Sequence, residues 1–93
     1  MPLTGTFQTP NAAKYLGQLC KHFGHKIEVE YTETEGTAHF IFGPAHFRAD
    51  DTTLTVQFDL LHDAATDSAK GVIDSHLERF AFREDFKNMN WSA

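Results

Sequence analysis

Histidines are the residues of this sequence whose type and position could carry chemistry. The 93-residue chain contains six of them. His76 falls in the middle of an apolar helical pattern, Arg79 follows one turn later, and Arg83 lies on the same side if the helix continues. A buried imidazole needs hydrogen-bond partners, so His76 is either a satisfied core residue or part of a cationic pocket for a carboxylate or phosphate. The sequence leaves both interpretations open.

A second group lies at the end of the preceding helical pattern. His22 and His25 bracket Gly24, and Cys20 comes just before them. Because imidazole is a preferred ligand of zinc, iron and copper, one hypothesis is a transition-metal site made by His22, His25 and His76, which requires two helices to meet. The alternative is that His22 and His25 interact with the exposed carbonyls of a helix C-terminus. Cys20 lies on the apolar side of its helix, which predicts an inert buried thiol.

A third group lies on the polar side of the predicted strands. We predict a two-residue corner at 43–44, which would set His46 opposite Ile41 and Arg48 opposite His39, about 5 Å apart. The resulting outer-face patch of His39, His46 and Arg48 is either merely solvated or binds an anionic ligand or an acidic partner.

The known catalytic motifs do not match. The sequence has no nucleophile elbow, P-loop, dinucleotide fingerprint or HExxH pair. Glu84 and Asp85 are adjacent, so on a regular element they point apart, and we expect a solvated surface there. We therefore lean against an enzyme. A small hydrolase or isomerase with His76 as general base remains a hypothesis that requires a cavity beside this residue.

Hydrophobic periodicity defines the elements that must position these residues. A period of two predicts strands, and apolar residues at 3.6 spacing predict two helices. We expect Thr9 and Pro10 to start the first helix and Gly24 to end it in the left-handed conformation. The predicted strands are 3–7, 27–31, 38–42, 45–49 and 54–60, with turns at 33–36, 43–44 and 51–52, and the predicted helices are 10–23 and 63–82.

These elements predict one domain over residues 1–93. The fold class is α+β, a two-layer sandwich in the order β-α-β-β-β-β-α, with two helices packed on one face of an antiparallel sheet. The other face is polar and open to solvent or to a partner. Phe86 and Trp91 in the tail are expected to pack back on this body.

Composition limits the partners and the compartment. A formal charge of −5 and a pI of about 5.6 disfavour nucleic-acid binding, and no apolar run is long enough for a membrane span. The single cysteine cannot form an intramolecular disulfide, and the first residues do not match a signal peptide. We therefore predict a cytoplasmic location.

Two segments, Tyr15 to Lys26 and His76 to Glu84, resemble the signature segments of a bacterial domain-of-unknown-function family, number 2218. The resemblance extends over essentially the whole chain, including the late Trp91. It implies a bacterial protein with no established activity and a loose association with iron- and siderophore-related proteins. The signature positions that it marks are Cys20, His22, His25, His76, Arg79 and Arg83.

Three functional hypotheses follow. The first is a small cytoplasmic binding or accessory domain, linked to iron or siderophore handling by the resemblance, whose candidate ligand-binding residues are His22, His25, His76, Arg79 and Arg83. The second is a protein-interaction module that forms a homodimer through a sheet edge or the outer face. The third is the hydrolase or isomerase.

Overall fold

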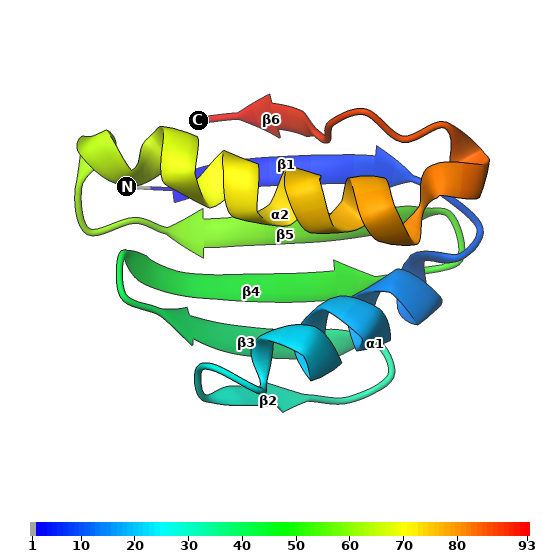
Figure 1. Ribbon diagram of the computed structural model, residues 1–93, viewed down its shortest axis with the longest axis horizontal. Coiled ribbons are helices and arrows are strands. Elements are labelled where there is room, and N and C mark those ends of the chain that lie inside the picture. Colours follow the sequence, from blue (N-terminus) through cyan, green and yellow to red (C-terminus); the bar gives the residue numbers. More distant parts are fainter. Residues whose placement is uncertain (1) are drawn as a thin grey trace.

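A six-stranded sheet covered by two helices on one face makes up the protein (Figure 1). The computed structural model describes residues 2–93. Its strands are β1 (Pro2–Gln8), β2 (Val29–Tyr31), β3 (Glu35–Phe40), β4 (Gly43–Ala49), β5 (Thr53–Asp59) and β6 (Asn90–Ser92). Its helices are α1 (Ala12–Phe23) and α2 (Thr66–Phe80), with 3-10 turns at η1 (Asp63–Ala65) and η2 (Phe82–Glu84). The predicted α+β class and the two-layer arrangement are confirmed.

The sheet is antiparallel throughout, with the strand order β2-β3-β4-β5-β1-β6. The meander β2 to β5 follows the chain, and β1 then pairs with the far side of β5. In Figure 1, α1 lies in front of the β2–β4 half of the sheet and α2 lies in front of β1 and β5. The two helices therefore share one face and contact each other, as the metal and pocket hypotheses require.

The core fills the space between the helices and the sheet. The periodic apolar residues of both helices are buried there, including Leu16 and Leu19 of α1 and Ile73 and Leu77 of α2. The strands contribute alternate residues such as Phe58, which is fully buried. This alternation leaves the opposite face of the sheet to polar side chains.

The C-terminal segment adds a strand that the sequence analysis did not predict. β6 pairs with β1, and the indole of Trp91 lies against Gly5 so closely that a Cβ there would come within 2.7 Å of a ring carbon. The Asp74 carboxylate of α2 accepts hydrogen bonds from the backbone N–H of Met89, at 2.9 Å, and from the indole N–H of Trp91, at 3.0 Å. The tail packs back as expected, through a strand and a half-buried acceptor.

The start of α1 differs from the prediction. The helix begins at Ala12 with Asn11 as its N-cap, because Thr9, which directly follows β1, still bonds across to the turn before β5. The backbone N–H of Thr9 donates to the carbonyl of Thr52, while its hydroxyl accepts the N–H of Asn11 at 3.1 Å. The prediction of Thr9 as N-cap and Pro10 as first helical residue is therefore wrong.

The ends of both helices also differ. Gly24 ends α1 in a right-handed conformation (φ −60°, ψ −15°), so the predicted left-handed cap was wrong. Its N–H continues the helical pattern to the carbonyl of Cys20. The predicted helix 63–82 is a 3-10 turn, then α2, then a second 3-10 turn, and the left-handed residue that follows is Asp85 (φ 58°).

The β3–β4 corner lies two residues earlier than predicted. The turn is at Ile41 and Phe42, and Gly43 already pairs with Phe40. Gly43 has φ +131° and lies so close to the carbonyl of Asp59 that a Cβ would collide with it, which explains why only glycine fits there. Similarly, the turn before β3 is at 32–34, because residues 35 and 36 already pair as strand, and β2 begins at Val29 rather than at 27.

Candidate functional site

Two histidines from different helices meet over the sheet. His22 is in the last turn of α1 and His76 in the middle of α2, and their ring centroids are 4.5 Å apart with planes tilted by 55°. Both side chains are half-buried. They line a cavity of about 160 Å³, which we call the histidine pocket; its residues are His22, Phe23, Lys26, Ile27, Phe40, Val72 and His76.

A backbone hydrogen bond fixes the His76 ring. Its Nδ1 lies 2.5 Å from the carbonyl oxygen of Val72, so Nδ1 carries the proton and donates. Nε2 is then the nitrogen left for a ligand. The ring of Phe23 lies edge-on at 5.0 Å, and packing against it further limits movement of the imidazole.

The electrostatic surroundings of His22 are positive. Burial lowers the pKa of His22 from its ordinary value, and repulsion by His76, Lys26, His25 and Arg79 lowers it further. None of these contributions comes from a carboxylate. On a chain with a net charge of −5, this pocket is therefore a local concentration of cationic and titratable groups.

Not every residue of the first hypothesis joins the pocket. His25 is exposed beyond the end of α1, Arg79 is exposed but close enough to influence His22, and Arg83 is exposed with its guanidinium 5.5 Å above the ring of Phe82. Across residues 2–93 no three His, Cys, Asp or Glu side chains are grouped so as to hold a metal ion. The structure thus brings together a pair of histidines rather than the predicted trio.

The cavity that the hydrolase or isomerase hypothesis requires is present beside His76. A catalytic histidine is normally oriented by a carboxylate through its second nitrogen. Here the second nitrogen of His76 binds a backbone carbonyl, and within residues 2–93 neither His22 nor His76 has a carboxylate hydrogen-bond partner. The bond to Val72 leaves Nε2 of His76 as the nitrogen that would accept a proton, so the hydrolase or isomerase stays a hypothesis.

The outer-face patch has a different register and a different charge from those predicted. Thr37 is opposite His46, Glu35 is opposite Arg48 and Pro44 is opposite His39. The expected pairs of His46 with Ile41 and of Arg48 with His39 were wrong because the corner lies two residues earlier. Ile41, at the tip of the hairpin, is almost fully exposed.

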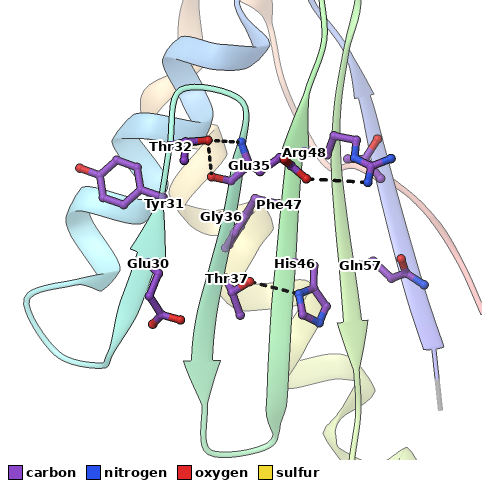
Figure 2. A pocket seen from close by; sticks show the side chains of 11 residues that line it. Glu30, Tyr31, Thr32, Glu35, Gly36, Thr37, His46, Phe47, Arg48 and Gln57 are labelled. Carbon is purple, nitrogen blue, oxygen red and sulfur yellow. Dashed lines mark hydrogen bonds and ion pairs between the residues drawn. The ribbon is translucent and has the colours of Figure 1, made fainter.

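Each cationic member of the patch has a polar partner. His39 Nε2 is 3.1 Å from the Glu30 carboxylate, and this hydrogen bond raises the pKa of His39. Arg48 lies 3.9 Å from Glu35. His46 forms a hydrogen bond with Thr37. Figure 2 shows this bond and the contact between Arg48 and Glu35. Both lie in a shallow groove of about 550 Å³ along β2–β5, which we call the outer groove. The groove is mixed in charge and not a basic patch.

A single carboxylate, which the sequence does not reveal as a half-buried partner, joins the start of α1 to the segment after α2. Glu84 was expected on a solvated surface, but its carboxylate accepts hydrogen bonds from the Thr9 hydroxyl (2.6 Å), the Asn11 amide (3.1 Å) and the Tyr15 phenol. Although burial opposes ionisation, these bonds keep the pKa of Glu84 below its ordinary value. Burial and the carboxylate raise the pKa of Tyr15 to about 12.

Cys20 is fully buried, and burial raises the pKa of its thiol to about 11, which agrees with the inert thiol that we predicted.

No helix within residues 2–93 combines the length and the apolar character that a bilayer span requires.

Comparison with solved structures gives a full-length match. The NMR structure of PA4090 from Pseudomonas aeruginosa is similar with a TM-score of 0.79 and 28% sequence identity, over 98% of this chain and 94% of that chain. No curated protein matches. A family model described as an uncharacterised protein conserved in bacteria (DUF2218) matches residues 4–92. The chain therefore belongs to this bacterial family, as the two signature-like segments indicated.

Proposed function

We propose that this protein is a small binding or accessory domain that takes an anionic ligand in the histidine pocket. The observation that carries the proposal is the pair His22 and His76, which face each other at 4.5 Å beside a cavity, with Lys26 in its lining. The Lys26 ammonium donates hydrogen bonds, and the free Nε2 of His76 becomes a donor when its ring is protonated, as does His22 when it gains a second proton. Among residues 2–93, no carboxylate lines the pocket to compete with the ligand. We place this activity in the cytoplasm, and iron or siderophore handling is the setting that we propose from the family resemblance.

Proton coupling is a consequence of this proposal. A ligand anion favours the protonated form of His22, whereas the surroundings of the free pocket disfavour it. Binding should therefore take up a proton, so affinity should increase as the pH falls from 8 to 6. A site made only of Lys26 and Arg79 would show the opposite trend with phosphate, since both side chains stay charged while phosphate itself loses negative charge as the pH falls from 8 to 6.

The test is an NMR titration of the full chain with inorganic phosphate at pH 6 and pH 8, following the imidazole signals. We expect shifts of His22 and His76 that saturate, with tighter binding at pH 6. His76→Ala should weaken binding more than about tenfold while the chain stays folded. His62→Ala is the control, because His62 is exposed and lies outside the pocket.

Other results of these titrations would contradict the anion-binding proposal. If neither phosphate nor a carboxylate shifts any imidazole signal, or if His76→Ala lowers only the free energy of unfolding, then His76 is a structural residue and the proposal is wrong. A parallel titration with Zn²⁺ examines the metal hypothesis. Stoichiometric shifts of His22, His25 and His76 with zinc, and none with phosphate, would replace the anion by a metal.

The second candidate function is self-association through the outer groove. It is favoured by acidic and basic side chains that lie next to each other, Glu35 beside Arg48 and Glu30 beside His39, because such a surface can complement a second copy of itself. The edge strands β2 and β6 have only three residues each and offer little for edge pairing. Arg48→Glu should convert a dimer to a monomer in analytical ultracentrifugation. A wild-type protein that is monomeric at high concentration excludes this candidate.

A further inference from the structure

The histidine pocket has two chemically different sides, and this difference restricts the ligand. Its polar groups are His22 in the last turn of α1, Lys26 in the turn that follows α1, and His76 in α2. Phe40 comes from the sheet below, and Phe23, Ile27 and Val72 complete an apolar lining. A bare inorganic anion would satisfy only the first side and leave the second without contacts.

The volume of the histidine pocket is close to that of a cavity that holds one benzene ring. An apolar protein cavity of about 150 Å³ holds a benzene molecule, and the histidine pocket measures about 160 Å³. Aromatic rings already surround this space: Phe23 and Phe40 meet edge-on with centroids 5.0 Å apart, and Phe23 meets His76 in the same way, also at 5.0 Å. A further ring can add edge-to-face contacts of the same type.

We infer that the ligand of the histidine pocket is a monocyclic aromatic carboxylate, whose ring enters the apolar side and whose carboxylate contacts His22, His76 and Lys26. This inference rests on the proposed function and narrows its ligand class. The phenyl ring provides the burial, while the carboxylate provides charge-assisted hydrogen bonds at the exposed Lys26 end.

The experiment compares probes that separate ring from charge, using NMR titrations of the full chain at pH 6.5. Benzoate has both features, acetate and phosphate have only the charge, benzyl alcohol has only the ring, and cyclohexanecarboxylate has an apolar group of similar size that is not aromatic. We expect benzoate to bind at least about tenfold more tightly than acetate, phosphate and benzyl alcohol and severalfold more tightly than cyclohexanecarboxylate. Signals of Phe40 and of both pocket histidines should shift.

Two substitutions test the placement. Lys26→Gln should weaken benzoate binding about three- to tenfold, because it removes the ammonium group from an exposed position where folding is not affected. Lys21→Gln is the matched control, since Lys21 is also exposed, lies in the last turn of α1 and does not line the pocket. Val72→Phe should fill the cavity and abolish benzoate binding, and its unfolding curve verifies that the variant is folded.

The outcomes distinguish the inference from the proposed function. If acetate or phosphate binds as tightly as benzoate with shifts at His22 and His76, the anion site stands and the aromatic inference is wrong. The inference also fails if cyclohexanecarboxylate equals benzoate, or if benzoate binding is unchanged in both Lys26→Gln and Val72→Phe. If no probe shifts the pocket signals, or if benzyl alcohol equals benzoate, both the inference and the anion-binding function are overturned.

Discussion

The hydrogen bond between Tyr15 and Glu84 leads to a quantitative prediction for the free energy of unfolding. Tyr15 is only 3% exposed, and its phenol donates to the half-buried Glu84 carboxylate, which joins the first turn of α1 to the end of η2. Hydrogen bonds to charged groups contribute about 1.5–3 kcal/mol. Because Thr9 and Asn11 continue to hold the carboxylate, we expect Tyr15→Phe to lower the free energy of unfolding at pH 7 by about 2 kcal/mol.

Alkaline pH should destabilise the wild type through the same side chain, because burial and the Glu84 carboxylate both oppose ionisation of the Tyr15 phenol. The pKa of Tyr15 rises from 10.0 in the unfolded chain to about 12 in the folded protein. The stabilisation is therefore complete below pH 10 and is lost as the pH rises through 12. A rise of this size corresponds to roughly 2.7 kcal/mol in all, of which about 1.4 kcal/mol is lost by pH 11. The Tyr15→Phe protein lacks this group, so its stability should approach that of the wild type as pH increases.

The assay is urea unfolding followed by Trp91 fluorescence from pH 7 to pH 11. Tyr31→Phe is the control, because Tyr31 is 48% exposed and should leave stability unchanged at every pH. A Tyr15→Phe protein within about 0.5 kcal/mol of the wild type at pH 7 would refute the reasoning. So would a stability difference that stays constant from pH 9 to pH 11.

Four other substitutions test local packing, each by urea unfolding. Gly5→Ala should cost about 1–3 kcal/mol because the new methyl group collides with Trp91, whereas Gly17→Ala has open space and should stabilise α1 by up to about 1 kcal/mol; equal effects would contradict this account. Gln18→Met should raise stability by about 1 kcal/mol, because the Oε1 atom of Gln18 is buried without a hydrogen-bond partner in the described chain. Asp74→Ala should cost about 2–3 kcal/mol by releasing Met89 and Trp91, and an unchanged fluorescence spectrum would argue against it.

The place of His76 at the helix interface could be predicted because it follows from helical periodicity. His76 lies beside the buried positions Ile73 and Leu77, and His22 lies beside Phe23, so two helices packed on one face bring both imidazoles to the same interface. The sequence could not show whether the space between them was filled. That depends on how the side chains of the sheet, above all Phe40, fit beneath the helices.

The elements that escaped prediction are those determined by distant contacts. Glu84 looks like a surface residue because its partners Thr9, Asn11 and Tyr15 are far away in the sequence. Strand β6 is too short to show an alternating pattern, and its position is determined by β1 and by Asp74. The turn at Ile41 and Phe42 could not be recognised from the sequence, because Ile41 is apolar although it is exposed at the hairpin tip. An apolar residue there reads as a continuation of the strand.

The place of β1 between β5 and β6 has a consequence for how the molecule folds. All pairings of β1 join residues that are far apart in the chain, and those with β6 span almost its whole length. Such nonlocal contacts slow folding, since a long loop must close before they form. Until β6 arrives, β1 is an open edge that can pair with another molecule. Refolding at high concentration should therefore favour exchange of C-terminal strands between chains.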